Sequence, residues 1–267
     1  MLTNKGRTHI LPIRIDMGVL QDFLRLNMCR IFDRQPSDWR DLQEMVAQLF
    51  RELGCEVTVG GRAELVRGSK EIDVDVLDSA SVPPARYLCE CKYWQKSVSL
   101  ETVHSFRTVI QDCGANRGYI VSMAGFQSGA HKAATKTNVE LVTFARLQDI
   151  FYERWVRAMG EHYRSWGDRL FPYWDYPGKK PSKPWSRNDA NKVHVAYDAF
   201  HPITAFGPLF EEQGCQWKLP MTLPILDEAG NVSGSLELRT YREVYDFVEA
   251  NKERALTYFQ RLYGEIE

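Results

Sequence analysis

The stretch YLCECKYW, residues 87–94, constrains the fold more than any other part of the sequence because it reads as a strand that carries charge. Side chains alternate between the two faces of a strand, so Glu90 and Lys92 share one face. Cys89 and Cys91 share the other face and are expected to be small core residues. Charged groups are costly to bury unless they are paired or bound to a metal. The strand therefore has one solvated face, or its charged face lines a functional site.

The segments around this strand predict an α/β core over residues 39–149. Their hydrophobic patterns follow the order helix, three strands, helix, strand, helix, strand. The segments are residues 39–53, 55–59, 71–77, 86–93, 99–114, 118–123, 124–137 and 139–144. Residues 60–70 are expected to form a polar, glycine-containing loop. This order is typical of a mixed sheet flanked by helices.

The flanking regions predict two further parts of the chain. Residues 1–38 are expected to form an N-terminal helical extension, with an amphipathic helix over residues 17–32. Residues 150–267 are expected to form an α+β C-terminal accessory domain whose role the sequence leaves open. Its features are an aromatic-rich run over 150–176, a proline-rich basic stretch over 177–189, two strands joined around Gly230 and Asn231, and a helix over 242–263.

Composition excludes few classes of function. Lysine and arginine number 34 and aspartate and glutamate 35, so the net charge of −1 gives no sign of a nucleic-acid partner, although a local basic surface would be enough. None of the six cysteines forms a CxxC pair, which argues against a zinc site. No apolar run approaches the length of a membrane span, and no signal-peptide core is evident. We therefore expect a protein of the reducing cytoplasm that does not enter a membrane.

Asp73 brings a second carboxylate to the charged face if the strands over 71–77 and 86–93 are neighbours. Adjacent carboxylates repel each other, and a divalent cation such as Mg²⁺ relieves that repulsion while keeping waters and phosphate oxygens as further ligands. A lysine beside them can orient a water or stabilise charge on a phosphate. Asp73, Glu90 and Lys92 are thus equipped for metal-assisted phosphodiester hydrolysis.

The pair of motifs EIDVDV and YLCECKYW resembles the acidic and Glu-x-Lys signature of the PD-(D/E)xK nucleases. More narrowly, it resembles the Mrr-type restriction endonuclease domain. The surrounding segments are similar too: LGCEV resembles the end of the first helix and the first strand, and GGRAELVRGSK resembles the glycine-rich loop. GYIVSMAGFQSGAHKAATKTNVELVTF resembles the later strands and helix. The resemblance covers residues 39–149.

The resemblance implies roles for individual residues. Asp73 and Glu90 would hold Mg²⁺, for which Mn²⁺ could substitute, and the backbone carbonyl of Cys91 would be a third ligand. Lys92 would act on the attacking water and the phosphate. Asp75 lies on the same face one step beyond the family position, so we expect it to support the ligands without touching the metal.

The first helix departs from the family pattern. Members often carry a glutamate eleven residues before the glycine that ends this helix, and counting back from Gly54 reaches Gln43. At about 100° per residue, Gln43 lies beside the apolar stripe of the helix and can face the site, whereas Glu44 faces solvent. Gln43 is the catalytic candidate and Glu44 a supporting one. A neutral amide there favours one metal ion over two.

A basic stretch in the C-terminal region is the candidate nucleic-acid-binding surface. It consists of Lys179, Lys180, Lys183 and Arg187, interleaved with Trp185. Such residues can grip a phosphate backbone and stack on a base. A merely exposed linker explains the same composition equally well, and the sequence does not decide between the two.

The function that these observations imply is a Mg²⁺-dependent endonuclease acting on DNA. The resemblance adds a setting in restriction or defence against foreign DNA. Cutting both strands would favour a homodimer, because each core has one site, and an activating ATPase or sensor subunit could control it. One alternative is a catalytically weak, DNA-binding subunit of a multi-protein complex, which Gln43 favours. The other alternative is a nuclease for branched DNA or RNA.

Overall fold

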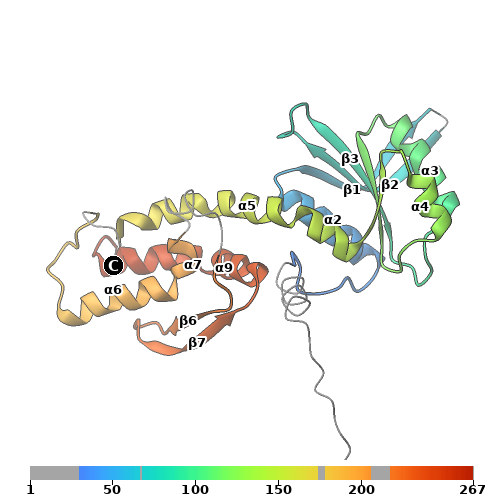
Figure 1. The fold of residues 1–267 in the computed structure, drawn as a ribbon. Helices are drawn as coiled ribbons and strands as arrows, with labels where there is room; N and C mark the ends of the chain where they lie inside the picture. The colour runs from blue at the N-terminus through green and yellow to red at the C-terminus, as the bar shows by residue number, and fades with distance from the viewer. Residues whose placement is uncertain (1–29, 67, 174–177, 206–216, 267) are drawn as a thin grey trace, which may run out of the picture.

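The computed structural model describes residues 30–66, 68–173, 178–205 and 217–266. The sheet-containing part comprises α2 (Trp39–Glu52), β1 (Glu56–Leu65), β2 (Gly68–Asp78), β3 (Ala85–Lys92), α3 (Leu100–Asp112), β4 (Arg117–Ser122), α4 (Ser128–Ala134) and β5 (Val139–Thr143). The remainder comprises α5 (Phe144–Leu170), the 3-10 turn η1 (Phe171–Tyr173), α6 (Arg187–Ala199), α7 (His201–Thr204), β6 (Met221–Leu226), β7 (Val232–Leu238) and α9 (Tyr241–Leu262). Figure 1 shows that α5 leads from the sheet to the helices of the C-terminal part.

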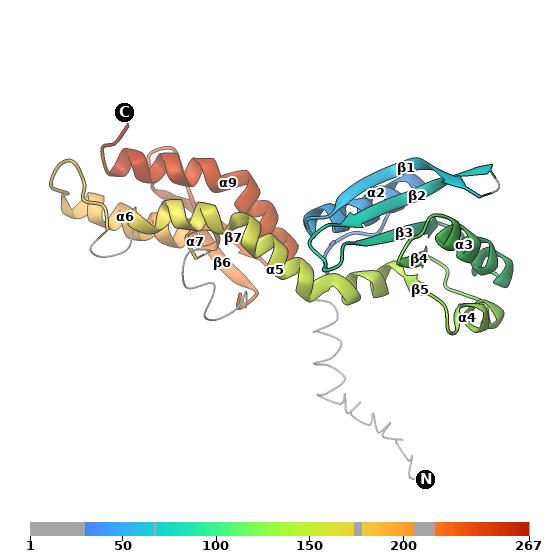
Figure 2. The same ribbon diagram turned by 90° about the horizontal axis from the view of Figure 1, so that it is seen from above.

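The five strands of the main sheet lie in the order β1-β2-β3-β4-β5. The pairs β1–β2 and β2–β3 are antiparallel, and the pairs β3–β4 and β4–β5 are parallel. The two parallel connections pass through α3 and α4, which lie together beside the sheet in Figure 2. The expected mixed sheet flanked by helices is therefore confirmed.

The two faces of β3 belong to different hydrophobic clusters, because its side chains alternate. Cys89 and Cys91 pack in the cluster built by α2 and α5. Leu88 packs in the other cluster, built by α3 and α4, and Glu90 follows it on that face. Both cysteines are buried, as expected for core residues. The charged face of β3 is therefore the face that α3 covers.

The expectation of a loop over residues 60–70 is wrong. The segment is the end of a long β-hairpin, in which Ala63 pairs with Lys70. Ala63 and Leu65 are half-buried against the second cluster, while Arg62 and Glu64 are exposed. This alternation is a strand signal, but the glycines at 60 and 61 hide it, and Gly60 takes a positive φ of 64°.

The helix α2 has a side-chain cap at its start and a glycine just after its end. The side chain of Asp38 accepts a hydrogen bond from the Asp41 amide at 2.9 Å, which satisfies one of the free amides at the helix start. Leu53 is the C-cap, and Gly54 follows with a φ of 82°, a conformation that favours glycine. The apolar face of the helix, which includes Leu42, Met45 and Leu49, is buried in the first hydrophobic cluster.

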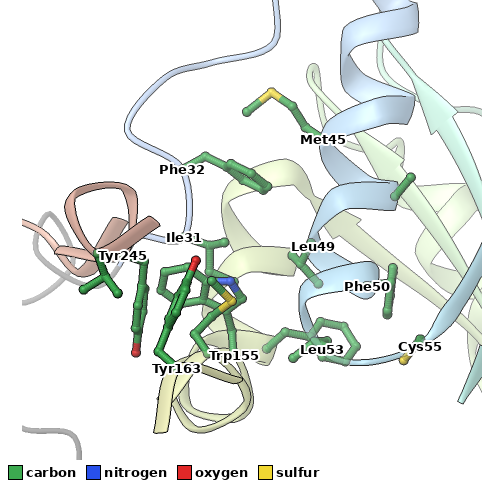
Figure 3. Close-up of a cluster of buried hydrophobic side chains, with 14 of the residues drawn as sticks. Ile31, Phe32, Met45, Leu49, Phe50, Leu53, Cys55, Trp155, Tyr163 and Tyr245 are labelled. Atoms are coloured by element: carbon green, nitrogen blue, oxygen red, sulfur yellow. The ribbon is translucent and has the colours of Figure 1, made fainter. Parts of the chain in front are cut away.

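Hydrophobic packing is continuous from the sheet into the C-terminal part. Figure 3 shows Leu49 of α2, Trp155 of α5 and Tyr245 of α9 in one cluster, in which the rings of Trp155 and Tyr245 lie 5.1 Å apart. The helix α5 runs unbroken through residue 150, where the sequence suggested a division. Residues 17–29 of the helix expected over residues 17–32 lie outside the described residues. Residues 30–32 are not helical, so the expectation is wrong there, and Ile31 is fully buried in this cluster.

The C-terminal part contains the two strands and the final helix that its sequence predicts. β6 and β7 pair antiparallel around a turn at residues 227–231, and α9 begins at a capping box formed by Thr240 and Glu243. None of the helices in the described ranges combines the length and apolarity that a membrane crossing needs.

Candidate active site

Glu90 and Lys92 form an ion pair on the α3-facing side of β3. The distance from Lys92 Nζ to Glu90 Oε1 is 2.5 Å, and Glu90 is only 8% exposed. Lys92 also lies over the ring of Trp94, with Nζ 4.9 Å from the ring centre. A buried carboxylate and a half-buried ammonium are thus held side by side at the carboxyl end of a central strand.

Asp73 lies where β2 and β3 stop pairing through their backbones. The final backbone pair of β2 with β3 joins Val74 to Cys89. One residue further along the antiparallel register, Asp73 lies opposite Glu90. Beyond it, Asp73 Oδ2 accepts a hydrogen bond from the Cys91 amide at 2.7 Å. The N–H and C=O of one strand residue point to the same side, so the Cys91 carbonyl also points toward β2. Asp73 is therefore fixed beside the Glu90–Lys92 pair.

The two carboxyl groups have pKa values shifted in opposite directions. Burial raises the pKa of Asp73, and the negative charge of Glu90 raises it further. Burial acts in the same direction on Glu90, but the charges and hydrogen bonds of Lys92 and Lys70 outweigh it and lower the pKa of that carboxyl. Glu90 is therefore the firmly anionic member, and Asp73 holds a proton more readily.

Lys70 is a charged residue of this site that the sequence did not reveal. Its Nζ lies 3.1 Å from Glu90 Oε2, so the two oxygens of Glu90 are each bonded to a different lysine. The sequence signal was hidden because residues 60–70 read as a loop. In the structure, Lys70 belongs to β2 and its side chain reaches across to the charged face of β3.

The donor set fits a small, hard cation. Among the described residues, no three His, Cys, Asp or Glu side chains gather as a metal site. Mg²⁺, however, binds through one or two carboxylates and keeps several waters. Asp73 and Glu90 are near enough for the charge of one to raise the pKa of the other, a repulsion that a cation would relieve. Asp73, Glu90 and the Cys91 carbonyl are the groups that could hold it.

The cysteine thiols do not compete for that role. Cys89 and Cys91 project into the opposite cluster, and burial raises the pKa of both thiols. A thiol must lose its proton to ligate a metal. The sulfur atoms are therefore neutral packing groups, on the opposite face of β3 from Glu90 and Lys92.

The structure does not bring Asp75 into this cluster. Its carboxylate accepts two hydrogen bonds from Arg86, at 3.0 and 2.6 Å, and Arg86 also donates to the Cys113 carbonyl. The shared face was predicted correctly, but Arg86 takes Asp75 toward the end of α3. Asp75 therefore ties β2 and β3 to α3 instead of supporting the ligands.

The two candidates on α2 separate as helix geometry predicts. Glu44 is exposed and pairs with Arg51 at 2.5 Å, so it does not support the site. Gln43 is half-buried on the second turn of α2. The Tyr93 hydroxyl donates to the Ser37 carbonyl at 3.0 Å, which holds the end of β3 against the start of this helix. None of the hydrogen bonds among the described residues joins Gln43 to Asp73 or Glu90.

The basic stretch near residue 180 is only partly available for binding. Lys179 is bonded to Glu265 at 2.6 Å and to the Tyr173 hydroxyl at 2.9 Å. Trp185 donates to the Leu262 carbonyl and packs edge-on against Tyr263, so it is held by α9. All four basic residues, Lys179, Lys180, Lys183 and Arg187, are exposed, but Lys179 is engaged by Glu265 and the Tyr173 hydroxyl. Lys179 and Trp185 thus serve the fold of the C-terminal part.

Part of this chain is similar to known proteins. Residues 35–151 match the sequence model of the Mrr catalytic domain, described as a restriction endonuclease. An uncharacterised protein of Sinorhizobium fredii, y4cE, is 25% identical over 163 residues, which are 57% of this chain and 40% of that protein. This chain therefore matches less than half the length of that relative.

Two solved structures share a distant likeness in shape. A protein of unknown function, AF1548, has a TM-score of 0.34 at 13% identity, covering 84% of this chain and 97% of that one. The MspJI restriction endonuclease in complex with a 27-mer oligonucleotide has a TM-score of 0.29 at 17% identity, covering 59% of this chain and 35% of that one. Such low scores carry no information about the chemistry of this chain.

Proposed function

We propose that this chain, whose residues 35–151 match the Mrr-type restriction endonuclease domain, is a Mg²⁺-dependent endonuclease that hydrolyses phosphodiester bonds of DNA. The observation that carries the proposal is the convergence of Asp73, Glu90 and Lys92 at the carboxyl end of β3. A mere surface ion pair would be solvated, whereas Glu90 is buried between two lysines.

The residues of the site have distinct roles in this proposal. Asp73, Glu90 and the Cys91 carbonyl would hold Mg²⁺, with Mn²⁺ as a substitute, and the cation would supply charge neutralisation at the phosphate. Lys92, fixed 2.5 Å from Glu90, orients the attacking water and stabilises negative charge that develops on the phosphate oxygens. Gln43 would hydrogen-bond a water from the edge of α2.

The wider setting is also a proposal. The description of the matched family supports DNA as substrate and restriction or defence as the role. A homodimer would place two sites on the two strands, and an activating ATPase or sensor subunit would restrain cutting of host DNA. The C-terminal region, residues 150–267, would act as an accessory domain, with Lys180, Lys183 and Arg187 available to phosphates.

A non-catalytic DNA-binding subunit is the second candidate function. It is favoured by Gln43, a neutral amide where family members often carry a carboxylate. Retention of Asp73, Glu90 and Lys92 together weighs against it, because a binding module has no need of a buried carboxylate between two lysines. Cleavage of branched DNA or RNA would keep the same chemistry with another substrate.

A cleavage assay distinguishes these functions. Supercoiled plasmid, single-stranded DNA, a four-way DNA junction and RNA are incubated with Mg²⁺, Mn²⁺ or EDTA, using wild type and Glu90→Gln. We expect metal-dependent cutting of duplex DNA that EDTA and Glu90→Gln abolish. Tight DNA binding without cutting under any metal would favour the binding subunit, and preferred cutting of junctions or RNA would reassign the substrate.

A further inference from the structure

The carboxylate of Glu90 is shared between two lysines that differ in how firmly they are held. Lys92 lies 2.5 Å from Oε1, and 16% of its side chain is exposed. Lys70 lies 3.1 Å from Oε2, and 32% of its side chain is exposed. Each ammonium also lies over an aromatic ring, Lys92 at 4.9 Å from the centre of Trp94 and Lys70 at the longer distance of 5.8 Å from the centre of Phe106. Lys70 is therefore the partner that can leave Glu90 more easily.

The charges of the site balance while it holds neither a metal ion nor substrate. Asp73 and Glu90 supply two negative charges, and Lys70 and Lys92 supply two positive charges. A divalent cation bound to both carboxylates adds two positive charges in a buried setting, where uncompensated charge is costly. Two anionic groups, such as a phosphodiester and a neighbouring phosphate, restore the balance. The second lysine thus adds a demand for a second phosphate, because with one lysine a single anionic group would restore the balance.

We propose that Lys70 is a second phosphate-binding lysine of this site, which bonds to Glu90 when no metal is present and moves to a substrate phosphate when a cation takes Glu90. The inference rests on the proposed nuclease function and names a residue that the Asp73, Glu90 and Lys92 set does not include. A lysine suits the task because its ammonium is a compact charge on a flexible stem, able to exchange one oxygen partner for another.

The exchange predicts opposite effects of one substitution on two ligands. In Lys70→Met, the lysine that competes with the cation for Glu90 is gone. The protein without DNA should therefore bind Ca²⁺ several-fold more tightly. The same variant should bind duplex DNA about 10-fold more weakly in Ca²⁺, which supports binding without cleavage. The slope of log affinity against log salt should fall by about one, the value of one phosphate contact. Lys70→Arg should restore DNA affinity.

The test measures Ca²⁺ binding by calorimetry and DNA binding by fluorescence anisotropy in Ca²⁺ and in EDTA, with thermal melting as a check of folding. Lys252→Met is the matched control, because Lys252 pairs with Glu249 at 2.7 Å on α9, away from the sheet. Unchanged DNA affinity and salt slope in Lys70→Met would overturn the inference while leaving the nuclease proposal intact. A wild type that binds neither Ca²⁺ nor DNA would overturn both.

Discussion

Arg242 of α9 donates two hydrogen bonds, of 3.0 and 2.7 Å, to the carboxylate of Glu52, the last residue of α2. Only 10% of the Arg242 side chain and 16% of the Glu52 side chain are exposed. Trp155 of α5 donates to the same carboxylate at 2.6 Å, and Arg242 also donates to the Ile31 carbonyl. One buried ion pair thus connects the C-terminal helix, α5 and the segment before α2 to the helix that packs on the main sheet.

Loss of this pair should destabilise the whole chain. Arg242→Met leaves Glu52 as a buried carboxylate without its cation, and removal of one partner from a buried pair costs about 3–5 kcal/mol. Urea unfolding of wild type and variant measures the difference. Arg239→Gln is the control, since the Arg239–Glu237 pair is exposed and such pairs contribute about 1 kcal/mol or less. Equal losses in the two variants would contradict the account.

Gly118 is required by the close packing of α3 on β4. A Cβ at this position would lie 2.6 Å from Ile110 Cδ1 and 2.7 Å from Phe106 Cε1, and both side chains are fully buried. Gly118→Ala should therefore cost about 1–3 kcal/mol by overpacking. Gly129→Ala on α4 is the control, because its Cβ would meet Leu100 at an ordinary 3.6 Å and alanine favours a helix. Thermal and urea unfolding should show a loss of stability in Gly118→Ala and none in Gly129→Ala.

The ion pair of Asp78 with Arg154 should make the stability of the protein fall at low pH. Asp78 is 1% exposed, and its bond to Arg154, 2.7 Å long, lowers the pKa of the carboxyl. A lowered folded-state pKa stabilises the protein above the unfolded pKa of about 3.9, and the contribution is lost as pH falls through the folded value.

Asp78→Asn removes that contribution at every pH. The free energy of unfolding of the variant should be about 1–3 kcal/mol below that of wild type at pH 7. This difference should become smaller as pH falls below about 4. Urea unfolding at pH 7, 5 and 3.5 provides the comparison, in which the titration of other carboxyl groups cancels. A gap that stays constant over this range would show that Asp78 does not titrate with a lowered pKa.

The helices and strands around the site could be predicted from sequence because each carries a local signal. The periodicity of α2, with Gly54 at its end, and the alternation in β3 are of this kind. The end of the hairpin was missed because Gly60 and Gly61 imitate a loop, although alternating burial shows a strand. A local sequence pattern thus predicts a helix or strand where the residue types favour the same structure as the spacing of the apolar positions.

The partners of individual charges could not be predicted in the same way. Asp75 was placed on the correct face, but its pairing with Arg86 depends on strand register. Lys70 reaches Glu90 across twenty positions of sequence. Lys179 is neutralised by Glu265 at the far end of the chain. Such pairs form between residues that the tertiary fold brings together, so a short stretch of sequence does not reveal them.

The most direct test of the central claim compares Lys92→Met with Asp75→Asn in one plasmid-cleavage assay with saturating Mg²⁺. Both residues lie on the same face of neighbouring strands, and each forms an ion pair there, so the fold alone does not distinguish them. Lys92→Met should cut at least about 100-fold more slowly than wild type, and Asp75→Asn should cut within a few-fold of wild type per folded molecule. Equal rates in all three proteins, or a greater loss in Asp75→Asn, would contradict the assignment of Lys92 to the chemistry.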